Sequence, residues 1–250
     1  MRGVLFDLGG TLLDYAGSTG WQRVLESAYR AVHDVVVGAG HRGGFAAFQD
    51  RMWQVEQALW EAARAGTAAP TMEVAMAEVV ASLGLASDPS VVARCVRAYE
   101  LSLRAACEVY PDSASTLAAL KERGLRVGLV SNTLLAGEFH VADLARFGLL
   151  DHLDDLVFSS EVGAWKPQPR VFHLALERLG VSAREAVFVG DRLIDDVGGA
   201  QTAGCLGVLK VLPGEEADYA EGEALGIVPD GRIQMLSELP SLIDALASRR

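Results

Sequence analysis

Four short polar motifs stand directly beyond apolar segments of the chain. In chain order they offer a carboxylate, a hydroxyl beside an amide, an ammonium group and two further carboxylates: Asp7, Ser131 with Asn132, Lys166, and Asp191 with Asp196. Ligands of open α/β sheets bind beyond the carboxyl ends of the strands, so these side chains are predicted to meet in space. One acid at such a place would be ordinary helix capping. Four motifs of complementary chemistry indicate a shared site.

The chemistry that these side chains suit is phosphoryl transfer. A carboxylate can attack phosphorus and form an aspartyl-phosphate, which divides one difficult displacement into two. Because carboxylate and phosphate repel each other, such a nucleophile needs a cation beside it. Converging carboxylates suit Mg²⁺, which prefers oxygen ligands, while a lysine, a serine hydroxyl and backbone N–H groups can hold the phosphoryl oxygens.

The order and spacing of the motifs resemble the haloacid dehalogenase-like (HAD) hydrolase superfamily over nearly the whole chain. The resemblance rests on Asp7 with Thr11, then Ser131, Lys166-Pro167, and Gly190-Asp191 with Asp196. It implies a Rossmann-like core with an inserted helical cap of the C1 type. The fourth motif and the Lys-Pro-x-Pro segment are close matches to the family pattern.

The resemblance also implies a role for each residue. Asp7 would be the nucleophile, and Lys166 would act beside it in catalysis. The implied Mg²⁺ site consists of one carbonyl and three carboxylates, the last acting through a metal-bound water: Gly9, Asp7, Asp191 and Asp196. The residues expected to hold the phosphoryl group are Ser131, Asn132 and Lys166.

Position 9 departs from the family pattern. Phosphatases of this family usually carry an aspartate there, which protonates the leaving oxygen and then activates water. Gly9 has no side chain for either step, although its carbonyl can still bind a metal. Some members with other residues at this position act on different bonds, and some with glycine remain phosphatases. We therefore expect the departure to affect rate and substrate class more than fold.

The leading interpretation is an Mg²⁺-dependent phosphatase of a small phosphorylated metabolite, and two alternatives stay open. One is a 2-haloacid dehalogenase, in which an aspartate attacks carbon and no metal is needed. The acids Asp191 and Asp196, which suit a cation, argue against it, and such dehalogenases usually carry an aromatic residue where Gly9 lies. The other is a non-catalytic phosphate-binding module, which would gain little from Asp7, a carboxylate that repels its ligand.

The elements that must position these motifs repeat a pattern of helix, glycine and short apolar strand. Helices are predicted over residues 113–123, 169–179 and 194–203, each followed by a glycine typical of a left-handed C-cap. Asp195 is expected to cap the last of these helices. The predicted strands are residues 4–6, 127–130, 156–158, 186–189 and 206–209. These runs lack alternation and are expected to be buried on both faces, which predicts an α/β fold with a doubly wound parallel sheet.

Residues 15–108 break this pattern and contain only helical periodicity. We expect them to form an inserted, all-helical cap, with residues 1–14 and 109–250 forming the catalytic α/β core. Trp53 and Trp60 stand seven positions apart and are expected to pack in the core of the cap. The first candidates for substrate contacts near the cap boundary and the lysine are Tyr15, Trp21 and Trp165, and the alternative for each is a packing role.

Composition narrows the partners and the compartment. The 250 residues are 50% hydrophobic and carry 22 Lys and Arg against 33 Asp and Glu, a net charge of −11. So acidic a chain is not expected to bind nucleic acid, and it has no apolar run long enough to cross a membrane. An acid already at Asp7 argues against a signal peptide. Three cysteines without metal spacing favour a reduced, cytoplasmic setting, and no feature predicts an oligomeric state.

Overall fold

The centre of the molecule is a six-stranded sheet in which all neighbouring strands run parallel, in the order β5-β4-β1-β6-β7-β8. The computed structural model describes residues 1–67, 70–85, 88–214 and 216–248. The strands are β1 (Gly3–Phe6), β4 (Arg126–Ser131), β5 (Asp155–Phe158), β6 (Ala186–Gly190), β7 (Leu206–Lys210) and β8 (Gly231–Ile233). The predicted α/β fold with a doubly wound parallel sheet is confirmed. Strand β8 was not predicted, because its three residues at the sheet edge contain no apolar run.

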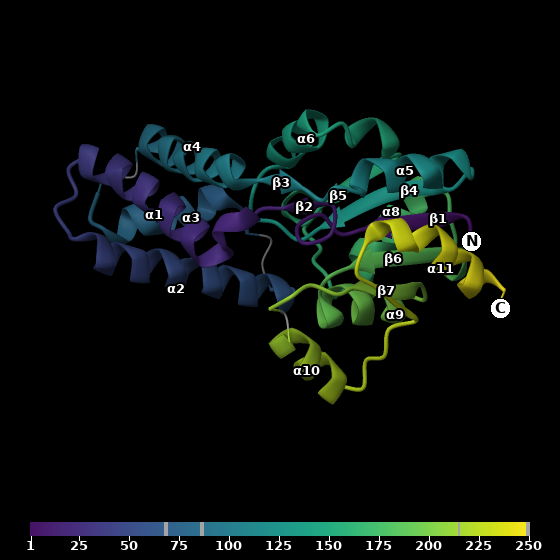
Figure 1. The fold of residues 1–250 in the computed structure, drawn as a ribbon. Helices are drawn as coiled ribbons and strands as arrows, with labels where there is room; N and C mark the ends of the chain where they lie inside the picture. The colour runs from purple at the N-terminus through teal and green to yellow at the C-terminus, as the bar shows by residue number, and fades with distance from the viewer. Residues whose placement is uncertain (68–69, 86–87, 215, 249–250) are drawn as a thin grey trace.

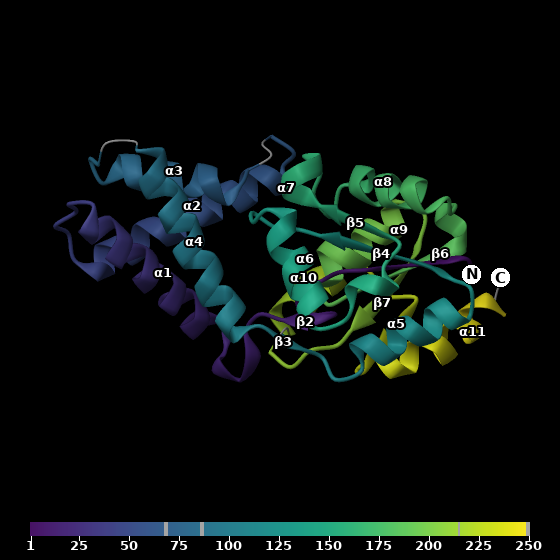
Figure 2. The same ribbon diagram turned by 90° about the horizontal axis from the view of Figure 1, so that it is seen from above.

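Helices cover both faces of this sheet (Figure 2). Helices α5 and α11 lie on one face, and α8 and α9 lie on the other. The alternation of side chains along β1 shows why both faces are apolar, since Val4 and Phe6 join one buried cluster while Leu5 joins the other. After β1, the chain adds β4 and β5 on one side of it and then β6, β7 and β8 on the other side. The strand order therefore reverses at β1, where the carboxyl ends of β1, β4 and β6 lie side by side.

Figure 1 labels the helices of the molecule. They are α1 (Trp21–Gly38), α2 (Phe45–Arg64), α3 (Met72–Ser82), α4 (Pro89–Ala106), α5 (Ser113–Glu122), α6 (Gly137–Arg146), α7 (Ser159–Val162), α8 (Pro169–Leu179), α9 (Gly199–Thr202), α10 (Glu216–Ala224) and α11 (Leu239–Ala247). No helix in the described ranges is long and apolar enough to span a bilayer. The cysteines Cys95, Cys107 and Cys205 are buried free thiols.

Helices α1–α4 form a separate bundle at the end of the molecule opposite the two termini (Figures 1 and 2). A two-stranded antiparallel ribbon, β2 (Leu13–Asp14) and β3 (Glu108–Val109), lies where the chain enters and leaves this bundle. Asp14 shapes the entry turn, because its Oδ1 accepts hydrogen bonds from the N–H groups of Ala16 and Gly17 at 2.8 and 3.0 Å.

The bundle has its own apolar core, to which the two tryptophans of α2 contribute unequally. Met52 is fully buried, whereas Trp53, the next residue, is 50% exposed. One residue along a helix turns the side chain by about 100°, which carries Trp53 away from the buried face. Trp60 packs edge-on against Trp165 with ring centroids 4.8 Å apart. The expected core position is therefore wrong for Trp53.

The segment after β6 winds more widely than predicted. A π-helix (Leu193–Gly198) precedes the short α9 where one α-helix was expected. Asp195 and Asp196 lie inside this wide turn, and both are buried. Asp195 therefore does not cap the helix as expected. π-helical turns of this kind are common at functional sites.

Candidate active site

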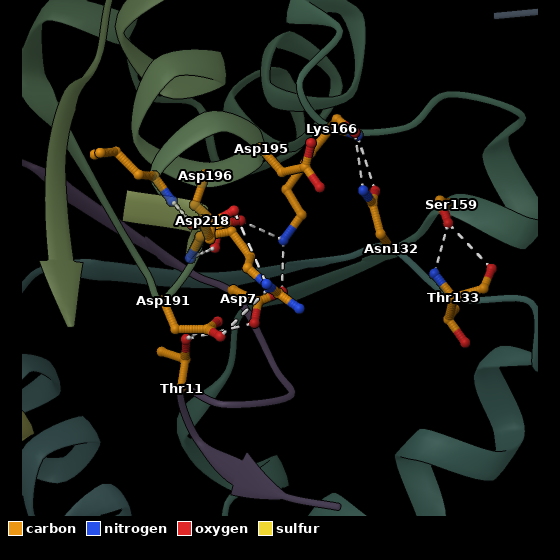
Figure 3. Close-up of polar contacts among 12 residues, drawn as sticks. Asp7, Thr11, Asn132, Thr133, Ser159, Lys166, Asp191, Asp195, Asp196 and Asp218 are labelled. Carbon is orange, nitrogen blue, oxygen red and sulfur yellow. Dashed lines mark hydrogen bonds and ion pairs between the residues drawn. The ribbon is translucent and has the colours of Figure 1, made fainter. Parts of the chain in front are cut away.

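The predicted polar motifs come together at the carboxyl ends of the central strands (Figure 3). Asp7 directly follows β1, Ser131 ends the neighbouring β4, and Asp191 directly follows β6. Carboxylate oxygens of Asp7, Asp191 and Asp196 lie within 4.8 Å of one another, and all three residues are buried. We call these three residues the acidic cluster.

Lys166 supplies the positive charge of this cluster. Its Nζ lies 2.5 Å from Asp7 Oδ1 and 2.7 Å from Asp196 Oδ1, and its side chain is almost completely buried. The backbone of Lys166 is held by one amide side chain: Asn132 Nδ2 donates to the Lys166 carbonyl at 2.9 Å, and Lys166 N donates to Asn132 Oδ1 at 2.8 Å. In this arrangement Asn132 positions the lysine.

The loop after β1, residues 7–13, brings a hydroxyl and two glycines to the acidic cluster; we call it the β1 loop. Thr11 Oγ1 lies 3.4 Å from Asp7 Oδ2 and 3.5 Å from Asp191 Oδ1, so one hydroxyl reaches both acids (Figure 3). Gly10 has a φ of +86°, and a Cβ there would lie 2.5 Å from Asp191 Oδ2. Only glycine fits at position 10 for both reasons.

Position 9 has room that position 10 lacks. Gly9 is exposed, and the nearest atom to a Cβ added there is Tyr15 Cδ2 at 3.5 Å, an ordinary contact. The Tyr15 hydroxyl faces elsewhere, lying 2.9 Å from His140 Nδ1 and 3.4 Å from Asp143 Oδ2. The neighbouring tyrosine thus does not present its hydroxyl where the missing aspartate would act.

Burial and mutual repulsion govern the ionisation of the cluster. Burial raises the pKa of Asp7 to about 6, against the attraction of Lys166. Burial and the charges of Asp7 and Asp196 hold the pKa of Asp191 well above its ordinary value. Burial would lower the pKa of Lys166, but the charges of Asp196 and Asp7 outweigh it and raise that pKa. The lysine stays protonated, and repulsion between carboxylates adds to burial in raising the pKa of both Asp7 and Asp191.

This donor set fits a hard divalent cation. Three buried carboxylates face one another with one ammonium between two of them, so a further positive charge would relieve their repulsion. Oxygen donors of this kind suit Mg²⁺, and carboxylates usually supply only part of its ligands. Asp7, Asp191 and Asp196, all predicted as metal-binding residues, are thus placed where they could hold one ion.

The end of helix α2 contacts the site motifs at two points. Arg64 donates to Asp195 Oδ2 at 2.7 Å, and Gln168 Nε2 donates to the Ala63 carbonyl at 2.9 Å. Asp195 neighbours Asp196 in the chain, and Gln168 follows Lys166 by two residues. The helical bundle therefore docks beside the acidic cluster.

The three residues singled out for substrate contact occupy different environments. Trp165 is fully buried against Trp60 and offers no free surface to a ligand. Trp21 is 47% exposed at the start of α1. Tyr15 is partly buried at the entry to the bundle. Trp165 thus fits the packing alternative rather than the substrate contact, because its ring completes the packing between α2 and the loop that carries Lys166.

Arg64 and Gln168 were missed as site residues, and Thr11 was given no role. Thr11 was named only as part of the first motif, four residues after Asp7. Gln168 stands between two prolines of the third motif. Arg64 lies in the inserted helices, more than a hundred residues from its partner Asp195. No local sequence pattern predicts an ion pair between residues so far apart in the chain.

The chain belongs to the haloacid dehalogenase-like hydrolases: the family model matches residues 1–204. This finding confirms the predicted family and the predicted class of enzyme, a hydrolase. The curated relatives below bear phosphatase names and support a phosphoric monoester hydrolase.

Two relatives and two solved structures illustrate the similarity. Glyceraldehyde 3-phosphate phosphatase of Methanopyrus kandleri is 36% identical over 165 residues, covering 66% of this chain and 69% of that protein. Ribulose-1,5-bisphosphate 5-phosphatase of Halopiger xanaduensis is 33% identical, covering 96% of this chain and 98% of that protein. The HAD phosphatase structure from Thermococcus onnurineus matches with a TM-score of 0.66 at 25% identity, covering 97% and 98%. A 2-haloacid dehalogenase from Pseudomonas syringae pv. Tomato matches with a TM-score of 0.67 at 23% identity, covering 98% of this chain and 99% of that one, and shares the fold.

Proposed function

We propose that the protein is an Mg²⁺-dependent phosphatase that hydrolyses a small phosphorylated metabolite through an aspartyl-phosphate at Asp7. The observation that carries this proposal is the placement of the Lys166 ammonium between Asp7 and Asp196, inside the acidic cluster. A binding module would gain little from a buried carboxylate aimed at a phosphate. A nucleophile, by contrast, needs a fixed cation beside it, both to orient it and to attract the anionic substrate.

In the proposed reaction, an Asp7 oxygen attacks phosphorus, and the bond between phosphorus and the ester oxygen breaks. The leaving oxygen takes its proton from solvent, because Gly9 has no side chain to supply one. A water molecule then attacks the same phosphorus and displaces the Asp7 carboxylate, which returns the enzyme and releases phosphate. Lys166 holds the negative phosphoryl oxygens in both steps.

The remaining site residues orient the reacting groups. Thr11 fixes the carboxylate of Asp7 through its hydroxyl, and Asn132 fixes the backbone that carries Lys166. Ser131, buried at the end of β4, is proposed as a further donor to the phosphoryl group. Asp7, Asp191, the Gly9 carbonyl and Asp196 would hold Mg²⁺, which would neutralise charge on the phosphoryl oxygens.

Residues 15–108 are proposed to act as a cap over this site. The contacts of Arg64 and Gln168 with the end of α2 bring the bundle to the edge of the acidic cluster. Closure of such a bundle would exclude water and shape the space left for the substrate. The names of the Methanopyrus and Halopiger relatives, each a phosphatase of a small phosphorylated compound, support a substrate of that kind.

The test is hydrolysis of p-nitrophenyl phosphate by the purified protein, first with Mg²⁺ and then with EDTA. We expect turnover that needs the metal, and an Asp191→Ala variant that needs more Mg²⁺ for its half-maximal rate. The exposed Asp151 provides the matched control, since Asp151→Ala removes one charge far from the cluster. Full activity in EDTA, or the release of halide from a 2-haloacid in place of phosphate release, would contradict the proposal and support the dehalogenase alternative.

A further inference from the structure

A second lysine is buried near the acidic cluster and has no part in the chemistry proposed above. Lys210 is the last residue of β7 and is only 2% exposed. Its Nζ donates to the Gly10 carbonyl at 2.9 Å and lies 3.0 Å from the centre of the Tyr110 ring. One ammonium thus joins β7, the β1 loop and the segment that follows β3.

The use of lysine in this chain makes the position unusual. The sequence contains 22 lysines and arginines, of which only three are lysines: Lys121, Lys166 and Lys210. Two of these three are buried close to the acidic cluster, while Lys121 lies near the surface in an ion pair with Asp154. A lysine ammonium is a compact point charge with three donors, so it can bond a carbonyl and face an aromatic ring at once, as Lys210 does.

Nearby carboxylates and an aromatic ring stabilise the buried ammonium of Lys210. Burial lowers the pKa of Lys210 to about 8, and the charges of Asp191, Asp112, Asp14 and Asp7 oppose that lowering. The side chain therefore still carries a proton at neutral pH. The face of the Tyr110 ring attracts the same charge.

The bond to Gly10 acts on the part of the β1 loop that orients two acids. The Gly10 carbonyl belongs to the peptide group that joins Gly10 to Thr11, and the Thr11 hydroxyl reaches both Asp7 and Asp191. Gly10 itself lies against the Asp191 carboxylate, so close that a Cβ would collide with it. A small rotation of this peptide group would move the hydroxyl and the backbone beside both acids.

We propose that Lys210 is a positioning residue for the phosphatase reaction, which holds the peptide group between Gly10 and Thr11 and so fixes Asp7 and Asp191. The inference rests on the proposed function for its effect on catalysis. Its effect on the β1 loop can be measured without any activity.

The experiment compares Lys210→Met with wild type and with Lys121→Met, a control that removes the lysine remote from the site. The first measurement is amide hydrogen exchange of peptides covering residues 8–13, where the N–H groups of Gly10, Leu12 and Leu13 are hydrogen-bonded within the loop. Because the lost hydrogen bond has a charged donor, exchange is expected to quicken by about 10- to 100-fold in Lys210→Met only. Should Lys210→Met fail to fold, Lys210→Leu takes its place with the same expected result, since leucine also has no donor for the Gly10 carbonyl.

The second measurement is the hydrolysis of p-nitrophenyl phosphate with Mg²⁺. We expect kcat to fall by about 10-fold or more in Lys210→Met while KM stays within about threefold of wild type, because the loss falls on the orientation of the nucleophile. A general loss of structure would instead quicken exchange across the sheet. Unchanged exchange in residues 8–13 together with a wild-type kcat would overturn the inference. An inactive wild type whose loop still loosens in Lys210→Met would contradict the proposed function and leave the positioning of the loop supported.

Discussion

Two regions of the molecule bury carboxylates in opposite ways, the ends of the central strands and the helical bundle. At the ends of the strands, Asp7, Asp191 and Asp196 lie together around the ammonium of Lys166. In the helical bundle, Glu56 is buried and forms no ion pair with any residue that the structure describes, and its Oε2 accepts a hydrogen bond from Tyr29 at 2.8 Å. The Tyr99 ring lies beside that of Tyr29, with ring centroids 6.4 Å apart, so tyrosines take the place that a cation has in the core.

The comparison distinguishes ionised carboxylates that suit catalysis, in the acidic cluster, from Glu56, a polar group inside the packed bundle. A cluster of acids with a lysine stays ionised in part and can attract a cation and a phosphate. A lone acid among tyrosines is most stable when neutral, and burial raises the pKa of Glu56 to about 7. A substitution in the acidic cluster should therefore lower activity, whereas a substitution of Glu56 should change the pH dependence of stability and leave activity near wild type.

The largest effect is expected from Asp7→Asn, which keeps the shape of the nucleophile and removes its charge. Loss of a covalent nucleophile should lower kcat by at least about 10⁴-fold. Glu56→Gln makes the same change of acid to amide in the bundle and should leave kcat near wild type. Steady-state hydrolysis of p-nitrophenyl phosphate measures both. Substantial turnover by Asp7→Asn would show that the carboxylate of Asp7 is no more important for catalysis than that of Glu56.

The next effect concerns the missing aspartate at position 9. Proton transfer by a placed side chain contributes about 10²- to 10⁴-fold, so alkyl and sugar phosphates should be hydrolysed more slowly than aryl or acyl phosphates by a factor of that order. The second step lacks the same help, and aspartyl-phosphate should accumulate as a burst. A series of phosphate monoesters with different leaving-group pKa values measures the dependence.

Gly9→Asp sharpens this prediction, because the structure leaves room for the new side chain next to Tyr15. The variant should gain activity on alkyl phosphates in particular. A flat rate profile in the wild type, without a burst, would show that another residue supplies the proton.

The third effect is on stability and belongs to Glu56. Its pKa is raised from 4.5 to about 7 in the folded protein, so the folded state binds the extra proton. The resulting stabilisation is present below about pH 4.5 and is lost as the pH rises through 7, with a full change on the order of 3 kcal/mol. Unfolding followed by tryptophan fluorescence reports on the bundle, which carries three of the four tryptophans. Glu56→Gln should flatten this dependence; an unchanged pH profile would show that Glu56 is ionised in the folded bundle.

The smallest effect is expected where the two regions touch. Arg64→Ala removes the ion pair with Asp195, a contact between a half-exposed arginine and a buried acid. Such a pair contributes about 1 kcal/mol or less, so we expect KM to change by up to about fivefold with little change in Tm. Arg51→Ala is the control, because Arg51 pairs with Glu78 inside the bundle. Equal effects of the two variants would mean that Arg64 has no special link to the site.

The sequence predicted the central sheet well because each buried strand is a short apolar run ending in a polar motif. The same rule located Asp7, Ser131 and Asp191, since each follows or ends such a run. The same rule would have pointed to Lys210, which directly follows the predicted strand over residues 206–209 and is the last residue of β7. The small number of lysines in the chain was a second signal for that position.

Other features depend on contacts that no local pattern carries. The exposure of Trp53 and the burial of Trp165 follow from how α2 packs against its neighbours, which helical spacing alone does not decide. The pairing of Arg64 with Asp195 joins residues far apart in the chain. The π-helix that contains the buried Asp195 and Asp196 also has the sequence pattern of an ordinary α-helix.

The covalent role of Asp7 is tested most directly by trapping the intermediate. Wild-type protein mixed with an aryl phosphate and Mg²⁺ is quenched in acid during the first turnover, digested, and examined by mass spectrometry. The account predicts one phosphoryl group on the peptide that contains Asp7, absent from Asp7→Asn and present in Glu56→Gln. Turnover without any phosphorylated peptide, or with the phosphoryl group on another residue, would contradict it.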